Sequence, residues 1–120
     1  FKSNKRTIIM SILEEYKKIR KESQIKDFDL NYYSIGLGGE VGEVLNEIKK
    51  LHRDDNDILT DDRKKRIISE MGDCMWYLQG MCDSININIE EVFQSNIDKI
   101  SKNKSSLIKN SSNENLYKFN

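Results

Sequence analysis

The sequence predicts an all-α fold, a four-helix antiparallel bundle. Apolar residues recur at three- and four-residue intervals in four separate segments, which is the spacing of one buried face on a helix. Proline, the strongest helix breaker, is absent from the 120 residues. The connections between the four segments are short, and amphipathic helices joined in this way pack as antiparallel neighbours.

The first predicted helix runs from Lys5 to about Ile19. The second has Asp29 or Asn31 as its N-cap and extends to Leu51. Four glycines lie within the second pattern: Gly36, Gly38, Gly39 and Gly42. A glycine inside a helix costs about 1 kcal/mol relative to alanine, so we expect another helix or a ligand to approach closely there.

Residues 52–62 contain five aspartates and no apolar period, which indicates a solvated loop. The third predicted helix runs from about Arg63 to Ser84. Asn88 followed three residues later by Glu91 resembles a capping box and predicts the start of the fourth helix. Its core face consists of Ile89, Val92, Phe93, Ile97 and Ile100.

The length of 120 residues suits one domain with one hydrophobic core. We place this domain at residues 1–103. Residues 104–120 are rich in lysine, serine and asparagine and lack a sustained apolar period, so we expect a polar, mobile C-terminal tail.

Charge and apolar patterning favour a cytoplasmic protein. Lysine plus arginine and aspartate plus glutamate each number 20, so nothing indicates a nucleic-acid or membrane partner. No apolar run approaches the roughly 20 residues that a membrane helix needs, and the charged start resembles no targeting segment. Cys74 and Cys82 lie about 12 Å apart along one predicted helix, too far to pair. Unpaired cysteines fit a reducing compartment.

Two predicted helices carry acidic residues beside their apolar faces. On the second helix Glu40, Glu43 and Glu47 fall within about 60° of one another. On the third, Glu70 and Asp73 are about 60° apart, with Tyr77 one turn further on the same side. The two helices therefore present matching acidic edges toward the inside of the bundle.

Clustered carboxylates repel one another and stay ionised only if cations or hydrogen-bond donors compensate them. No arginine falls inward on these two patterns, so we expect a divalent ion. Oxygen ligands favour Mg²⁺, which often binds substrate phosphates as well, and this indicates a nucleotide-phosphate substrate. A di-iron bundle would require Glu-x-x-His pairs, and the single histidine, His52, forms none.

The run GLGGEVGEVLNEIKK, followed by ISEMGDCMWYL, resembles the Glu-x-x-Glu and Glu-x-x-Asp signature of the MazG-like all-α pyrophosphohydrolases. The 26 residues between Glu43 and Glu70 suit that family. The segment NIDKI is similar to the family's Asn-x-x-Lys segment, so the resemblance covers roughly residues 30–102. Family members often have an arginine shortly after that lysine, whereas this chain has Lys102, Asn103 and Lys104.

The resemblance implies Mg²⁺-dependent hydrolysis of a nucleoside triphosphate to the monophosphate and pyrophosphate, in house-cleaning or nucleotide-pool control, with Mn²⁺ able to substitute. Either Glu40 or Glu43 would act as the catalytic base. The metal ligands it implies are Glu40, Glu43, Glu70 and Asp73.

Three further residues are candidates for substrate binding. Asn96 lies in the middle of the fourth helix's apolar face and needs a partner, either a ligand or another helix. Lys99, at the edge of that face, could reach phosphate oxygens, and the resemblance favours that role over simple exposure. Tyr77 could stack on a base or border the pocket, although core or interface packing is the commoner role of such an aromatic side chain.

Several alternatives stay open. Related dUTP/dCTP hydrolases and phosphoribosyl-ATP hydrolase share the acidic core, and the glycine-rich approach to Glu40 favours the MazG branch. A different class is a non-catalytic helical oligomerisation module whose carboxylates are surface charge. The small core, the glycines of the second helix and the aromatic residues Trp76 and Tyr32 predict a homodimer or homotetramer.

Overall fold

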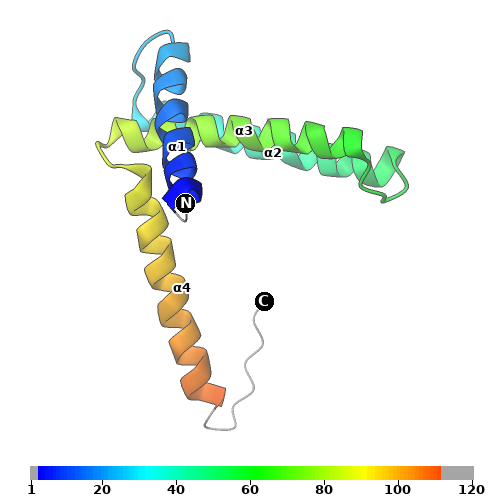
Figure 1. Ribbon diagram of the computed structural model, residues 1–120. Helices are drawn as coiled ribbons and strands as arrows, with labels where there is room; N and C mark the ends of the chain where they lie inside the picture. The colour runs from blue at the N-terminus through cyan, green and yellow to red at the C-terminus, as the bar shows by residue number, and fades with distance from the viewer. Residues whose placement is uncertain (1–2, 112–120) are drawn as a thin grey trace. The chain divides into compact units, whose positions relative to one another are not determined.

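The computed structural model describes the backbone of residues 3–111 and the side chains of residues 11–110. This part of the chain is helical with no strand, which confirms the predicted all-α class and the number of helices. The helices are α1 (Ser3–Ser23), α2 (Leu30–Asp54), α3 (Asp61–Ser84) and α4 (Ile89–Ser111), shown in Figure 1. None of them is both long and apolar enough to cross a lipid bilayer.

The chain divides into two compact units, one ending at Asn86 and the other beginning at Ile87. The first holds α1, α2 and α3, and the second holds α4. The sequence predicts a division at residue 103, whereas α4 continues as a helix to Ser111. Lysine and serine without glycine or proline allow this continuation. Residues 112–120 lie outside the described part of the chain, so the mobility expected for them stays a prediction.

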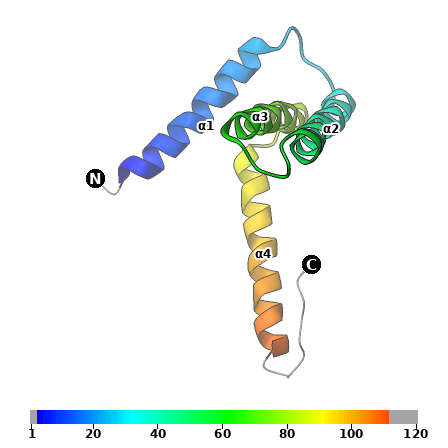
Figure 2. The same cartoon turned by 90° about the vertical axis from the view of Figure 1, so that its right-hand side faces the viewer.

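The main helix pair of the first unit is an antiparallel hairpin of α2 and α3, which lie side by side in Figures 1 and 2. Asp29 is the N-cap of α2, and its carboxylate accepts a hydrogen bond of 2.9 Å from the Tyr32 amide. Thr60 caps α3 in the same way, accepting from the Arg63 amide at 3.1 Å. One of the two caps proposed for the second helix is therefore confirmed.

The connection between α2 and α3 is shorter than the predicted loop at residues 52–62. Helix α2 continues to Asp54, and the amide of Asp55 still donates to the Leu51 carbonyl at 3.1 Å. The chain then turns through Asn56 and Asp57, whose φ angles of 54° and 60° are left-handed. Asparagine and aspartate tolerate this conformation better than other non-glycine residues, so the turn needs no glycine.

Helix α1 is attached to the hairpin through Arg20, which is 2% exposed. Its Nε donates to the Trp76 carbonyl at 2.6 Å, and its guanidinium lies 4.3 Å from the centre of the Trp76 ring. Its Nη1 also forms an ion pair with Asp83 at 3.1 Å. The indole of Trp76 donates to Ser23 of α1 at 2.9 Å. Trp76 therefore packs against a neighbouring helix of its own chain.

Apolar residues of the first helix recur at helical spacing, Ile12 and Ile19 among them, and this pattern predicts one buried face. Ile12 and Ile19 are 59% and 55% exposed, whereas the charged Arg20 is buried. Helical periodicity identifies an apolar face but not which residues a neighbouring helix covers. Here the contact runs through a guanidinium that lies between the Trp76 and Tyr33 rings.

Candidate metal centre

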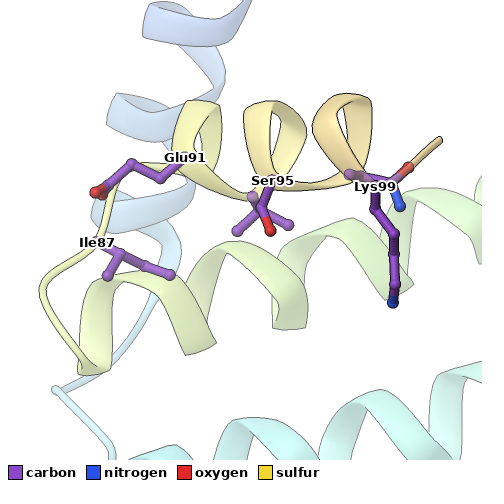
Figure 3. A pocket seen from close by; sticks show the side chains of 6 residues that line it. Ile87, Glu91, Ser95 and Lys99 are labelled. Atoms are coloured by element: carbon purple, nitrogen blue, oxygen red, sulfur yellow. The ribbon is translucent and has the colours of Figure 1, made fainter. Parts of the chain in front are cut away.

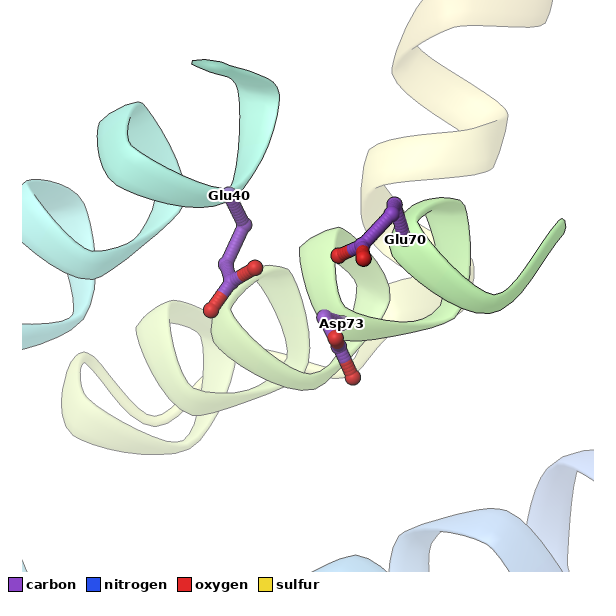
Figure 4. A group of neighbouring side chains, drawn as sticks. All are labelled: Glu40, Glu70 and Asp73. Atoms are coloured by element: carbon purple, nitrogen blue, oxygen red, sulfur yellow. The ribbon is translucent and has the colours of Figure 1, made fainter. Parts of the chain in front are cut away.

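Three carboxylates of the hairpin meet where α2 and α3 face each other. Glu40 comes from α2, and Glu70 and Asp73 come from adjacent turns of α3 (Figure 4). One carboxylate oxygen of each lies within 4.8 Å of the others. Glu40 and Glu70 are half-buried and Asp73 is exposed, so the group lies at the edge of the helix pair and is open on one side.

Glu43 lies one turn after Glu40 on α2 and is exposed. It is outside the group of three oxygens, although its charge acts on both Glu40 and Glu70. The structure thus brings three of the four predicted metal-binding residues together and leaves the fourth beside them.

The electrostatics of the group show the cost of crowding acidic side chains. Burial, followed by the charges of Asp73 and Glu43, raises the pKa of the Glu40 carboxyl above its ordinary value. Burial, followed by the charge of Asp73, raises the pKa of Glu70 in the same direction. Each carboxyl therefore binds its proton more tightly than it would in water, because burial and the neighbouring negative charges both disfavour the ionised form.

Within the described part of the chain, no lysine or arginine forms an ion pair with Glu40, Glu43, Glu70 or Asp73. The expectation that no arginine falls inward on these helices is nevertheless wrong. Arg63, at the start of α3, pairs with Glu47 at 2.6 Å, and its side chain is only 12% exposed. That arginine compensates Glu47 and leaves the acidic group without a cation.

Tyr77 borders the site, one turn beyond Asp73 on α3. Its ring fills the space beside Gly36 of α2, where a Cβ atom would overlap it. Burial is the main cause that raises the pKa of its hydroxyl, followed by Tyr32 and Glu40. Tyr32 lies next to it, with ring centroids 6.4 Å apart, and is 41% exposed. Aromatic rings thus adjoin the acidic group on the Gly36 side.

The sequence predicts a close approach of another helix or a ligand at the four glycines of α2, and the structure shows such an approach only at Gly36. A Cβ atom on Gly38, Gly39 or Gly42 would meet nothing within 4 Å in the described structure. The close approach that glycine permits is therefore made at Gly36 by the Tyr77 ring. Gly80 of α3, where no close contact was predicted, is a second such place, because Arg20 and Tyr33 occupy the space of its missing side chain.

Asn96 and Lys99, the predicted phosphate-binding residues, belong to the second unit. Both are exposed and line one hollow of about 380 Å³ on α4, together with Ser95 and Glu91. Figure 3 shows Ser95 and Lys99 projecting from the same side of the helix.

The predicted cap of this helix is also present, since the Glu91 carboxylate accepts from the Asn88 amide at 2.7 Å.

Three residues on the helices of the first unit have no role in the sequence-based prediction of the site. Tyr16 of α1 is half-buried, and its pKa is raised mainly by burial, with a smaller contribution from Asp73. The pKa of the Cys74 thiol is raised by burial and then by Glu40. The inward position of Arg63 is the clearest omission, and its spacing of seven residues from Glu70 was an available signal.

Comparisons with known proteins agree with this geometry. The family model for the MazG nucleotide pyrophosphohydrolase domain matches residues 30–107, a segment that contains all the predicted site residues. The Gene 37 protein of Mycobacterium phage L5 is 33% identical over 75 residues, which is 62% of this chain. The match spans 66% of that phage protein, just under two thirds of its length. No solved structure matches the chain.

The family match begins at the first residue of α2 and covers both helices of the hairpin as well as most of α4. Helix α1, with the buried Arg20, lies outside it. Because the matched segment makes up more than half of the chain and carries the acidic group, the chain belongs to the MazG nucleotide pyrophosphohydrolase domain family.

Proposed function

We propose that the protein hydrolyses a nucleoside triphosphate, either a ribo- or a deoxyribonucleotide, to the monophosphate and pyrophosphate in a Mg²⁺-dependent reaction. The observation that carries this proposal is the group of Glu40, Glu70 and Asp73, whose oxygens lie within 4.8 Å of one another without a paired cation in the described chain. Membership of a pyrophosphohydrolase family supports the reaction class.

The donor set fits Mg²⁺. All its ligand atoms are carboxylate oxygens, which hard divalent cations prefer, and the exposed side at Asp73 leaves room for water and phosphate oxygens. Mn²⁺ accepts the same ligands and is expected to substitute. Burial, and after it the charge of neighbouring carboxylates, raises the pKa values of Glu40 and Glu70, and a bound cation would relieve the repulsion between these carboxylates.

When bound, the metal neutralises charge on the phosphates and lowers the pKa of a water molecule. The residues of this chain have complementary tasks. Glu40, Glu70 and Asp73, with Glu43 beside them, hold the ion. A carboxylate oxygen of Glu40 or Glu43 accepts the proton that the attacking water loses. In this proposal Asn96 and Lys99 contact the phosphates, and Tyr77 contacts the nucleoside.

A second copy of the chain is part of the proposal. Helix α2 carries the exposed apolar side chains Val41, Leu45 and Ile48, which are 44%, 62% and 44% exposed. On α3, Ile68 and Met71 are 58% and 54% exposed. Exposed apolar rows of this kind are typical of subunit interfaces. We therefore propose a homodimer or homotetramer, acting in the cytoplasm, where the free thiols of Cys74 and Cys82 would stay reduced.

The experiment that tests the function is a screen of nucleoside triphosphates with pyrophosphate detection, which includes dUTP, dCTP and phosphoribosyl-ATP. We expect pyrophosphate release with millimolar Mg²⁺ and none with a chelator. Glu70→Gln should abolish turnover, whereas Glu14→Gln, a change of the same kind on exposed α1, should not. Full activity of Glu70→Gln, or activity in the presence of chelator, would remove the acidic group from the reaction.

A further inference from the structure

Glu47 extends the acidic edge of α2. It follows Glu43 by four residues and Glu40 by seven, so the three carboxylates lie along one side of the helix. Its side chain is only 9% exposed, and its charge acts on Glu70 of α3. Glu47 is outside the group of three convergent oxygens, but its charge belongs to the same acidic edge of α2.

Arg63 forms an ion pair with Glu47 and so neutralises one carboxylate of this acidic edge. Its Nη1 donates to Glu47 Oε2 at 2.6 Å, and its Nε donates to Asp55 Oδ2 at 2.7 Å. All three side chains are largely buried, with exposures of 12%, 9% and 17%. Hydrogen bonds from the guanidinium are the main cause that lowers the pKa of Glu47, so this carboxyl stays ionised and paired.

The pairing also joins the parts of the hairpin that set its register. Asp55 is the C-cap of α2, and Arg63 lies in the first turn of α3, three residues after its N-cap Thr60. Glu70 follows Arg63 by seven residues, two helical turns along the same side of α3. The Arg63 guanidinium therefore joins α2 to α3 on the side of the hairpin that also carries Glu70, two turns away.

We propose that Arg63 is a positioning residue of the metal centre, which neutralises Glu47 and so limits the centre to Glu40, Glu43, Glu70 and Asp73. A fifth free carboxylate would tighten metal binding and compete with substrate phosphate for coordination positions. This inference rests on the proposed metal site, and it adds a residue that sets the charge of that site without touching the metal.

The test is a double-mutant cycle of Mn²⁺ affinity, measured by electron paramagnetic resonance without nucleotide, on the full chain and on Arg63→Gln, Glu47→Gln and the double variant. Glu47 would keep only its longer ion pair with Lys50, at 3.4 Å, whose side chain is 41% exposed. Arg63→Gln removes the closer pair at 2.6 Å, so this variant should bind Mn²⁺ roughly three- to tenfold more tightly. Glu47→Gln should bind more weakly, and the double variant should return to the affinity of the unaltered protein.

The sign of the change separates this proposal from a purely structural role. If Arg63 only stabilised the hairpin, its loss would loosen the site and weaken Mn²⁺ binding. Arg66→Gln is the matched control, because Arg66 is nearer to Glu70 in sequence but lies on the exposed side of α3. Arg66 pairs with Asp62 at 3.1 Å, and the two side chains are 59% and 78% exposed. It should change the affinity less than about twofold.

Weaker or unchanged Mn²⁺ binding by a folded Arg63→Gln variant would overturn the proposal, as would an equal effect of Arg66→Gln. If circular dichroism shows that Arg63→Gln does not fold, the other two variants decide the question, and tighter or unchanged binding by Glu47→Gln would contradict it. Absence of Mn²⁺ binding by the unaltered protein is a distinct result, which would overturn the proposed metal site and this inference together.

Discussion

At the scale of single residues, the raised pKa values of Glu40 and Glu70 have a consequence for stability. An acid whose pKa is higher in the folded state keeps a proton that the unfolded chain has already released, so the free energy of unfolding falls as pH rises through that interval. For both residues the interval begins at the ordinary value of 4.5 and extends upward. Mg²⁺ binding should oppose this loss above that interval, because it favours the ionised, folded site.

In chelator, we therefore expect Glu40 and Glu70 to lower the melting temperature as the pH rises above about 4.5. At pH 7.5, millimolar Mg²⁺ should raise the melting temperature. Glu70→Gln should reduce both effects, and Glu14→Gln neither. The measurement is thermal unfolding by circular dichroism across pH. Equal melting temperatures in chelator and in Mg²⁺ at pH 7.5 would contradict a shared cation site.

The carboxylates of the site were predictable from sequence because each lies at helical spacing from its neighbour, Glu40 from Glu43 and Glu70 from Asp73. The spacing of Arg63 from Glu70 indicates the side of α3 on which it lies, but its pairing with Glu47 was not predictable, since Glu47 is on another helix. Whether the two meet depends on the length of the connection and on the left-handed residues Asn56 and Asp57 within it. Helical periodicity describes one helix at a time and does not predict which residues of two neighbouring helices lie opposite each other.

At the scale of the helices, Gly36 and Gly38 of α2 offer a direct comparison. Gly36→Ala would place a methyl group against the Tyr77 ring and should lower the free energy of unfolding by about 1–3 kcal/mol. Gly38→Ala meets nothing within 4 Å and should raise it by up to about 1 kcal/mol through helix propensity. Urea unfolding of both variants measures the difference. Equal effects would contradict the close contact between α2 and Tyr77.

The number and approximate position of the helices were predictable, but the C-terminal ends of α2 and α4 were not. Helix α2 passes through the acidic segment as far as Asp54, because the backbone hydrogen bonds to Leu51 continue there. Helix α4 runs through a polar segment to Ser111. In both places the sequence lacks an apolar period but also lacks a residue that stops a helix, and periodicity alone mistakes such a segment for loop or tail.

At the scale of the whole molecule, the exposed apolar rows of α2 and α3 predict self-association. Light scattering after size exclusion should give at least twice the 14.1 kDa mass of one chain. Leu45→Glu, which puts a charge into the row on α2, should shift the protein toward the monomer. Ile25→Glu, at a position that is 97% exposed between α1 and α2, is the control and should not. A monomer at micromolar concentration before any substitution would contradict the assembly.

The central claim is that the acidic group activates water for attack on the α-phosphorus of a nucleoside triphosphate. The most direct measurement is hydrolysis in ¹⁸O-labelled water, followed by mass spectrometry of the products. We predict the label in the nucleoside monophosphate, and a loss of turnover of at least about 100-fold in Glu43→Gln and Asp73→Asn, with helical circular dichroism retained. Label in pyrophosphate, release of orthophosphate, or full activity of both variants would contradict the account.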